Sequence, residues 1–339
     1  MGNDKIILDH GSGGKISHAM VSEMILPVFD NPILADLDDG ANLDINGLDK
    51  GRLAFSTDSY VVDPVFFPGG SIGDLAINGT VNDIAMCGAV PLYLSVGLII
   101  EEGFSYSDLN KILEEMGRAA DKAGVKVVTG DTKVVPKGKC DKIFINTSGV
   151  GVIPAGINVS GSMAVPGDKI ILSGTMADHG ITILSTREGL KFDADIKSDT
   201  AALNAMVKSM LDSICDIHVL RDPTRGGVGT TLNEIALQSN VGIRIEEESL
   251  PVKPAVAGIC ELLGFDPLYL ANEGKLLVFA GEKDARRTLE IIRQNEFGRD
   301  AVIIGEVVLQ DPGKVYMNTA IGGSRIVDML TGEQLPRIC

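Results

Sequence analysis

The chain has 339 residues, a formal net charge of −16, 45% hydrophobic residues, 40 glycines and no tryptophan. This length predicts two domains, each large enough to bury a core without disulfides or structural metals. The negative charge argues against a nucleic-acid partner, because no basic stripe could offset phosphate charge. Apolar runs such as Tyr93–Ile100 are too short to cross a bilayer, and the first residues lack a secretory pattern, so we expect a cytoplasmic protein without membrane contact.

The first half of the chain alternates between strand and helix patterns. Strands are predicted at 5–8, 52–57, 92–100, 125–129 and 143–152, and helices at 71–89 and 107–123. The first strand leads into the glycine loop His10–Gly14, and an irregular acidic stretch lies at 30–51. Small residues are dense in the helix at 71–89, which permits close packing against its neighbours.

A stretch rich in Gly, Ser and Pro between Pro154 and Pro166 marks the expected domain boundary. We therefore expect an N-terminal domain over 1–155, a C-terminal domain over 156–310 and a tail over 311–339. In the second half, strands are predicted at 169–173, 242–245, 275–280 and 301–308, and helices at 199–214, from 224 onward and at 283–296. The mixture is typical of an α/β or α+β enzyme, and its glycine loops match neither the Rossmann nor the P-loop pattern.

Three aspartates in glycine-rich surroundings indicate chemistry. Asp58 and Asp131 each follow an apolar strand, and open sheets place ligand sites at the carboxyl ends of strands. Asp83 lies in an apolar helix, where an unpaired carboxylate would be costly and would need a cation such as Mg²⁺. Each has a simpler interpretation: a strand-end turn, a Gly-Asp turn, and a helix cap or salt bridge. Together they favour a metal–nucleotide site.

Other segments leave two interpretations open. Lys133 could stabilise a phosphate or be an exposed strand-edge lysine. The segment Arg221–Gly227 precedes a helix whose N-terminus could hold an anion, or Asp222 or Thr224 could cap that helix. Glu273, in a predicted turn, could act as a base, whereas His179 is more typical of a loop residue.

The C-terminal tail ends in Pro336-Arg337-Ile338-Cys339. The polar residues 331–335 and the helix-blocking Pro336 predict a mobile segment. From Thr331 the tail could extend about 30 Å, against a radius of gyration of about 20 Å for a compact chain of this length. The Cys339 thiol could therefore reach the chain's own active site or that of a partner, and the alternative is a frayed end with a chance cysteine. The other cysteines form no CxxC pair, which indicates reduced thiols.

Taken together, these segments resemble the HypE family of nickel–iron hydrogenase maturation proteins, which are carbamoyl dehydratases. That family belongs to an ATP-using superfamily with aminoimidazole ribonucleotide synthetase, selenophosphate synthetase and thiamine-monophosphate kinase. The resemblance covers the whole chain, and PRIC at its end is the most specific element because the superfamily relatives lack it. The matching motifs are HGSGG (10–14), STDSYVVDP (56–64), FFPGGSIGDLAINGTVNDIAMCGA (66–89), VTGDTKVV (128–135), DHG (178–180), RDPTRGG (221–227), ANEGK (271–275) and PRIC (336–339).

The resemblance implies a two-domain α+β fold in which the N-terminal sheets of two subunits pair into a dimeric β-barrel, with a flexible C-terminal tail. Residues 1–155 would bind ATP and Mg²⁺ and form the homodimer. The implied activity is ATP-dependent dehydration of an S-carboxamide on Cys339 to a thiocyanate. The carbamoyl group would come from the carbamoyltransferase HypF, and the cyanide would pass to an iron held by the HypC–HypD complex.

The resemblance also assigns roles to residues. Cys339 would carry the substrate, Glu273 would be the base, with His179 as the alternative, and Lys133 would stabilise the phosphorylated oxygen. Asp58, Asp83 and Asp131 would hold Mg²⁺ and contact ATP. The further ATP contacts would be Gly11, Ser12, Gly13, Gly14, Asp39, Asp222, Arg225, Gly226 and Gly227. Two alternatives remain: an ATP enzyme of this superfamily acting on a free small molecule, and a nucleotide-binding scaffold of a maturation complex.

Overall fold

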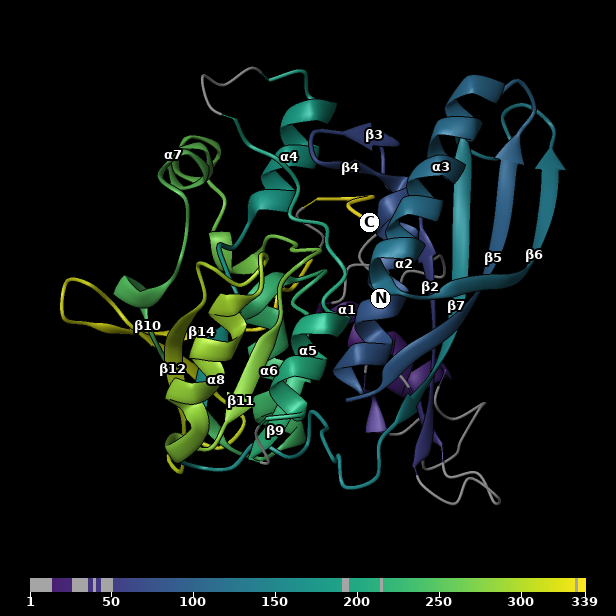
Figure 1. Ribbon diagram of the computed structural model, residues 1–339. Coiled ribbons are helices and arrows are strands. Elements are labelled where there is room, and N and C mark those ends of the chain that lie inside the picture. Colours follow the sequence, from purple (N-terminus) through teal and green to yellow (C-terminus); the bar gives the residue numbers. More distant parts are fainter. Residues whose placement is uncertain are drawn as a thin grey trace.

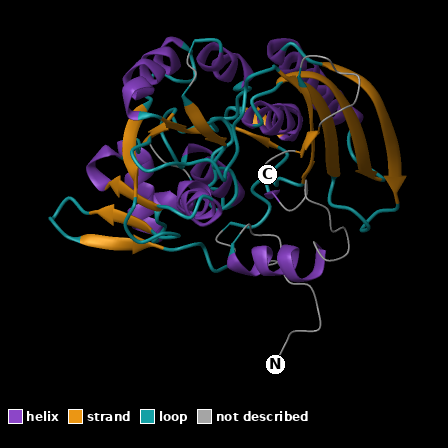
Figure 2. Cartoon of the chain, turned by 90° about the horizontal axis from the view of Figure 1, so that it is seen from below, coloured by secondary structure: helices purple, strands orange, loops and turns teal. Residues whose placement is uncertain are grey.

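The computed structural model describes residues 14–25, 36–38, 41–43, 51–190, 195–213, 216–332 and 335–339. These residues form two α+β units, each built around its own sheet, and the C-terminus lies between the two units in both ribbon views (Figures 1 and 2). The predicted strand at 5–8, the glycines of the loop before Gly14, and Asp39 lie outside the described residues.

The first unit is a mixed sheet with the strand order β1-β2-β7-β5-β6, in which only β5 and β6 are parallel neighbours. Its strands are β1 (Ala41–Leu43), β2 (Arg52–Tyr60), β5 (Val90–Glu101), β6 (Lys126–Val135) and β7 (Ile143–Ile153). A small hairpin of β3 (Phe66–Phe67) and β4 (Gly70–Ser71) precedes helix α2. Helices α2 (Ile72–Met86) and α3 (Tyr106–Ala123) cover the face that is turned toward the second unit (Figure 1).

Helix α2 packs closely on its neighbours because it carries glycine at its contact positions. Ser71 caps its N-terminus in a reciprocal capping box with Asp74. A Cβ at Gly73 would lie 2.6 Å from the Ile112 carbonyl oxygen on α3, and one at Gly79 would lie 2.2 Å from the Tyr60 hydroxyl on β2. The small residues predicted to permit close packing therefore do so.

The second unit is a sheet with the strand order β14-β13-β10-β12-β8-β11-β9, antiparallel except where β10 pairs with β13. Its strands are β8 (Lys169–Leu172), β9 (Ile217–Arg221), β10 (Gly242–Glu246), β11 (Leu277–Ala280), β12 (Val302–Val308), β13 (Val315–Asn318) and β14 (Ser324–Val327). Its helices are α4 (Asp178–Arg187), α5 (Asn204–Leu211), α6 (Gly227–Gln238), α7 (Pro254–Leu263) and α8 (Glu282–Gln294). Helix α1 (Lys15–Met20) continues into a π-helical turn, Val21–Ile25, and meets this unit through Lys15 and Asp328.

Two expectations about the C-terminal part are corrected. The tail does not begin at 311, because β13 and β14 are strands of the second sheet. The last five residues, predicted to be mobile, are docked in this structure, with Ile338 and Cys339 only 4% and 7% exposed. Docking is possible because the segment offers apolar side chains to the core and backbone groups to strand-like neighbours.

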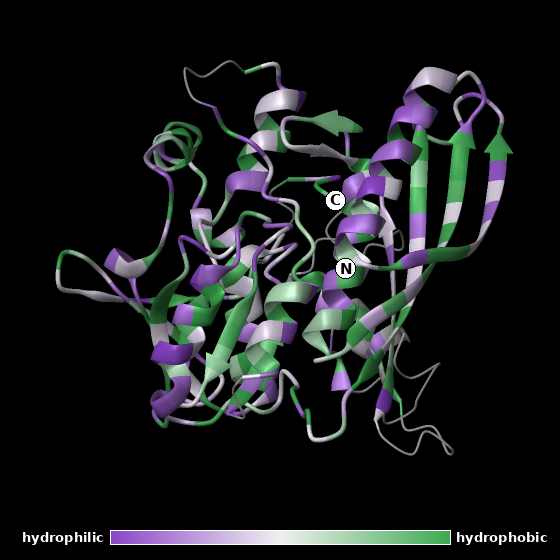
Figure 3. Ribbon diagram, viewed as in Figure 1, coloured by the Kyte–Doolittle hydropathy of each residue, from purple (hydrophilic) through white to green (hydrophobic). Residues whose placement is uncertain are grey.

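The outer face and edge of the first sheet remain open in the described part of this chain, and no closed barrel is seen. Much of the length of its strands has the colour of hydrophobic residues (Figure 3), and several of these residues are exposed. The most exposed on β6 are Val128 and Val134, with Tyr93 on β5 and Phe55 on β2. None of the helices in the described segments is both long and apolar enough to cross a membrane.

The close packing of α2 yields a stability prediction. We expect Gly79→Ala to lower the free energy of unfolding by about 1–3 kcal/mol, because the new methyl group would collide with buried Tyr60. Gly117→Ala in α3 is the matched control: its Cβ meets nothing within 4 Å, so we expect a gain of up to about 1 kcal/mol. Urea denaturation of both variants checks this, and equal shifts in the two would contradict it.

Candidate active site

The C-terminal tail pairs with the segment that follows β2. Val61 N–H donates to the Cys339 carbonyl oxygen at 2.9 Å, and Asp63 N–H donates to the Arg337 carbonyl oxygen at 3.4 Å. The two contacts run antiparallel, so the tail lies alongside residues 61–63, just beyond the end of β2. Cys339 is thereby fixed near the carboxyl end of β2.

Two arginines hold this pairing. The Arg187 guanidinium at the end of α4 donates to the carbonyl oxygens of Pro336 (2.6 Å) and Arg337 (2.7 Å), while its Nε donates to the Asp63 carbonyl oxygen (2.8 Å). Arg337 itself donates to the Val61 carbonyl oxygen at 2.8 Å and forms an ion pair with Asp141. One side chain of the second unit thus binds both the tail and the first unit.

His179 binds the tail rather than standing free as a base. It lies in the first turn of α4, not in a loop, and is fully buried. Its Nε2 lies 2.8 Å from the Ile338 carbonyl oxygen and its Nδ1 lies 2.7 Å from the Ser198 hydroxyl. A carbonyl oxygen only accepts, so the proton belongs on Nε2 and Nδ1 accepts from Ser198. Burial lowers the pKa of His179 and favours this neutral form.

Asp58 and Asp83 share one face of the first unit. Ser56, Asp58 and Tyr60 alternate along β2 toward α2, and the Ser56 hydroxyl donates to Asp83 Oδ2 at 2.7 Å. Burial raises the pKa of Asp58, an effect that Arg225 opposes. Burial, together with the charges of Asp58 and Asp83, raises the pKa of Tyr60 well above its usual value. The sequence-predicted pair of acids is therefore brought together.

The second unit adds Asp222, Arg225 and Glu273 to this face. Burial raises the pKa of Asp222 to about 6, and the charge of nearby Asp58 adds to it. Burial, followed by the charges of Asp199, Asp222 and Asp58, raises the pKa of Glu273 well above its usual value. Glu273 is 4% exposed, and among the described residues no donor lies within hydrogen-bond distance of its Oε1. This carboxyl group is thus suited to accept a proton.

Arg225 is the cation that these groups share. The nearby charge of Cys339, whose terminal carboxylate accompanies its thiol, is the largest influence raising the pKa of Arg225, and Asp58 and Glu273 add to it. The guanidinium therefore stays charged next to the tail. It links the end of the tail to carboxyl groups from both units.

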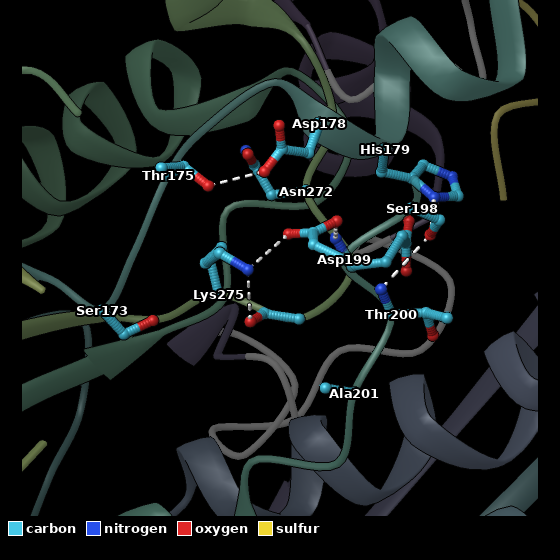
Figure 4. Close-up of polar contacts among 12 residues, drawn as sticks. Ser173, Thr175, Asp178, His179, Ser198, Asp199, Thr200, Ala201, Asn272 and Lys275 are labelled. Carbon is cyan, nitrogen blue, oxygen red and sulfur yellow. Dashed lines mark hydrogen bonds and ion pairs between the residues drawn. The ribbon is translucent and has the colours of Figure 1, made fainter. Parts of the chain in front are cut away.

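Asp199 and Lys275, labelled in Figure 4, form an ion pair next to the segment that carries Glu273. Asp199 Oδ1 accepts the Glu273 backbone N–H at 3.1 Å, and Asp199 Oδ2 lies 3.1 Å from Lys275 Nζ. Lys275 also donates to the Gly274 carbonyl oxygen at 3.2 Å. The segment 272–275 is therefore a fixed connection before β11 and not a solvent-exposed turn.

Gly226 and Gly227 lie at the N-terminus of α6, as predicted, although this helix begins at Gly227 and not at Thr224. Gly226 is the N-cap with φ +80°, and no side chain caps the helix. The capping alternative for Asp222 and Thr224 is therefore not observed. A Cβ at Gly227 would lie 2.6 Å from the Leu268 carbonyl oxygen, so only glycine fits there.

Asp131 and Lys133 do not join this site within one chain. Strand β6 continues to Val135, so Asp131 lies within an edge strand and not at its carboxyl end. Strands β7 and β5 separate it from β2 and Asp58, a distance of roughly 14 Å at the usual strand spacing. Asp131 pairs instead with Lys133 at 2.6 Å, and this contact lowers the pKa of Asp131. The predicted three-aspartate cluster is therefore wrong for a single chain.

A magnesium site would rest on fewer ligands than predicted. Within the described segments, no three His, Cys, Asp or Glu side chains lie close enough to hold a metal ion. Mg²⁺ bound with a nucleotide needs only one or two carboxylates, because phosphates and water supply its other ligands. Asp58 and Asp83 fit that role, since both are partly buried acids on one face. Gly14 is buried next to α1, whereas Gly11, Ser12, Gly13 and Asp39 lie outside the described residues.

Sequence reasoning missed four residues of the site: Tyr60, Arg187, Ser198 and Asp199. Tyr60 reads in the sequence as a strand aromatic, and Ser198 and Asp199 lie where a helix was expected to start, although α5 begins at Asn204. The sequence indicates Lys275 only as the last residue of the motif ANEGK. The alternation Ser56-x-Asp58-x-Tyr60 is the one sequence pattern that could have revealed Tyr60.

The chain matches two family models. Residues 37–153 match the model described as AIR synthase related protein, N-terminal domain, and residues 165–318 match its C-terminal domain. A structure of AaThiL complexed with AMPPCP and TMP has a TM-score of 0.71 over 96% of this chain and 99% of its own, at 21% identity, and it shows the shared fold alone. The fold and the interdomain site thus define a protein of the AIR synthase related class.

Full-length relatives narrow this class. Carbamoyl dehydratase HypE of Azotobacter vinelandii is 52% identical over 99% of this chain and 98% of its own length. The protein of the same name from Escherichia coli strain K12 is 46% identical over 99% of this chain and all of its own. The chain belongs to the carbamoyl dehydratase HypE family.

Solved structures agree. The crystal structure of a HypE–HypF complex matches with a TM-score of 0.87 and 49% identity, covering 92% of this chain and 100% of that one. The crystal structure of HypE in complex with ATP matches with a TM-score of 0.83 and 53% identity, covering 99% and 100%. The expected α+β fold of two domains is confirmed.

The raised pKa of Asp222 predicts a pH dependence of stability. Its folded pKa of about 6 lies above the usual 3.8, so the folded state holds the proton longer than the unfolded state. The contribution of Asp222 to the free energy of unfolding is present below pH 3.8 and is lost as pH rises through 6. In denaturation without nucleotide, we expect wild type to lose about 2–3 kcal/mol relative to Asp222→Asn between pH 4 and pH 7.

The matched control is Asp300→Asn, which changes an exposed aspartate of the same unit. Its denaturation curves should follow wild type across the same pH range. Parallel pH curves for wild type and Asp222→Asn would contradict the prediction.

Proposed function

We propose that the chain is an ATP-dependent carbamoyl dehydratase of nickel–iron hydrogenase maturation whose substrate is an S-carboxamide on its own Cys339. The observation that supports this most is the docked tail. The Cys339 carbonyl oxygen accepts the Val61 N–H, and Cys339 lies close enough to Arg225 to raise the pKa of that arginine. It also lies beside the buried acids of both units. The relatives named carbamoyl dehydratase and the ATP complex of HypE support the reaction class.

The chemistry follows from the difficulty of expelling an amide oxygen. The carboxamide oxygen on Cys339 attacks the γ-phosphorus of ATP, which forms a C–O–P bond and breaks the bond to ADP. Glu273 takes one amide proton, giving an imidate phosphate whose nitrogen is uncharged. The C–O bond then breaks, the phosphate leaves with the former amide oxygen and takes up the second N–H proton, and the thiocyanate remains on sulfur. General-base catalysis of this kind contributes about 10²–10⁴-fold.

Attachment to the tail keeps the carboxamide close to the groups with which it reacts. A carboxamide attached to Cys339 reacts within the same molecule, so binding a free substrate is unnecessary. The site is also dry, because Ile338, Cys339 and Glu273 are all buried, and electrostatic stabilisation is stronger where water is excluded. Arg225 is placed to stabilise negative charge that develops near the tail.

Mg²⁺ would neutralise charge on the ATP phosphates when bound. Asp58 and Asp83 are the residues that would hold it, since the structure separates Asp131 from them. The N-terminus of α6 at Gly226 and Gly227, together with Gly14 and the preceding loop, would contact phosphates through backbone N–H groups.

Lys133 and Asp131 would act in a homodimer. The apolar outer face and open edge of the first sheet suit pairing with a second copy, as in the dimeric barrel that the family resemblance implies. In that assembly β6 of the partner subunit would bring its lysine toward this chain's Cys339. The carbamoyl donor would be HypF, supported by the structure of a HypE–HypF complex, and the cyanide acceptor would be HypC–HypD.

The first prediction concerns the tail thiol. Cys339→Ala should keep ATP binding and folding but abolish both carbamoylation and dehydration, because the variant lacks the thiol that would carry the carboxamide. Intact-mass measurement after incubation with carbamoyl phosphate, HypF and ATP checks this. Cys140→Ala, which removes a half-buried thiol from the loop between β6 and β7, is the control and should behave as wild type. Productive modification of any residue other than Cys339 would overturn the proposal and favour a free small-molecule substrate.

The second prediction concerns Lys133. Lys133→Ala and Cys339→Ala should each be inactive as homodimers. When the two chains are co-expressed and the mixed dimer is purified, activity should return to about half of wild type, because one site then combines an intact tail with an intact lysine from the partner. A mixed dimer as inactive as its parents would contradict the shared site, and full activity of Lys133→Ala alone would remove the lysine from the mechanism.

A further inference from the structure

The loop over 195–203 lies between the docked tail and the segment that carries Glu273. Its Ser198 is anchored to the first unit, since its N–H donates to the Pro68 carbonyl oxygen at 2.9 Å. Two consecutive side chains of this loop then make contacts on opposite sides. Ser198 binds His179, and Asp199 binds the segment 272–275 (Figure 4).

The Ser198 contact reaches the tail through one intermediate. Its hydroxyl donates to His179 Nδ1 at 2.7 Å, which fixes the tautomer that donates from Nε2 to the Ile338 carbonyl oxygen at 2.8 Å. Phe67 packs its ring edge-on against the imidazole, at 5.6 Å between centroids. The imidazole therefore has one orientation, and Ser198 is the hydrogen-bond partner that sets it.

The Asp199 contact reaches the base directly. Its Oδ1 accepts the Glu273 N–H, and its Oδ2 pairs with Lys275. The two segments also touch along the backbone, because a Cβ at Gly274 would lie 1.8 Å from the Asp199 carbonyl oxygen. The side chains of Asp199 and Lys275 are only 4% and 9% exposed, so this ion pair is well screened from solvent.

A cavity of about 270 Å³ borders the loop, and its lining includes Ser198, Asp199 and Lys275. Neither Glu273 nor any residue of the tail lines it. It is large enough for several waters, at about 30 Å³ each. Asp199 and Lys275 thus lie between this cavity and the segment that carries Glu273.

We propose that Ser198 and Asp199 are positioning residues for the dehydration: Ser198 orients the tail through His179, while Asp199 fixes Glu273 and keeps a negative charge beside it. One loop would then place the carboxamide and its base together. This inference rests on the proposed function, in which Glu273 accepts the amide proton. It assigns to Asp199 an electrostatic role that a merely structural residue would not have.

The charges around Glu273 fix the sign of the expected pH effect. Asp199, Asp222 and Asp58 face it as anions, Arg225 faces it as a cation, and Lys275 is paired with Asp199. Burial opposes ionisation of Asp199, but Lys275, His179 and the Glu273 N–H hold the pKa of Asp199 below its usual value. Removing this charge lowers the pKa of Glu273, so the base ionises at lower pH and accepts a proton less readily.

The experiment measures single-turnover thiocyanate formation on the carbamoylated full-length enzyme as a function of pH. For Asp199→Asn we expect the acidic limb of the rate profile to move to lower pH by about one unit and the plateau to fall by about tenfold or more. Asp195→Asn is the matched control in the same loop, because Asp195 is exposed and pairs with Lys197. It should reproduce the wild-type profile.

Ser198→Ala tests whether Ser198 orients the tail through His179. It should leave the position of the acidic limb unchanged but raise the rate at which iodoacetamide alkylates Cys339 several-fold, because the imidazole that binds the tail loses its partner. If Asp199→Asn does not fold, Asp199→Asn combined with Lys275→Gln removes both buried charges and should show the same direction of shift. A wild-type limb and plateau in the Asp199 variants, or unchanged alkylation in Ser198→Ala, would overturn the inference.

Different results would contradict the proposed function and the positioning role of Asp199. Glu273→Gln should abolish the pH-dependent limb altogether. If Glu273→Gln keeps the wild-type rate, or wild type forms no thiocyanate on Cys339, the proposed function itself is wrong. If both behave as expected and only Asp199→Asn matches wild type, the positioning role alone is wrong.

Discussion

The structure depends on keeping several carboxyl groups out of water at the junction of its two units. Asp58, Asp222 and Glu273 are all desolvated there, and burial is the first cause of the raised pKa of each. A buried carboxylate without a cation is costly, so such groups hold protons or recruit positive charge. Arg225 supplies one cation, and a divalent ion arriving with a nucleotide would supply more. The same desolvation makes Glu273 a stronger base than an exposed glutamate.

The tail completes this junction at little net cost. Leu335, Ile338 and Cys339 join the core cluster that also contains residues of α2, α4 and α7. Burying two aliphatic side chains contributes about 3–6 kcal/mol, and hydrogen bonds of about 1 kcal/mol each add a similar sum. Ordering five backbone residues opposes this by about 5–10 kcal/mol. The favourable and unfavourable free energies of docking nearly cancel. A docked tail is therefore compatible with the mobility that the sequence of residues 331–335 predicts.

The sequence predicted the strands and helices of the first unit well, because their apolar periodicity is strong. It misjudged where strands end: Asp58 and Asp131 lie within β2 and β6, since polar residues continue a strand whose ladder partners are already in place. It also missed β13, which pairs with distant β10, and β14, which pairs with β13. In the site, Asp83, Glu273 and Cys339 were named correctly as neighbours of one interdomain region, but Ser198 and Asp199 carry no local pattern.

The distance between β6 and β2 in the first sheet supports the proposal that Lys133 acts on the tail of a partner subunit. An exposed ion pair such as Lys133–Asp131 contributes little because water screens it, so it holds the lysine weakly. A developing phosphate charge in a dry site would compete for it easily. The β6 edge that carries this pair is also where the sheet leaves hydrogen-bonding groups and apolar side chains uncovered. Dimerisation along that edge would therefore cover the exposed face and supply the missing cation in the same step, which ties catalysis to assembly.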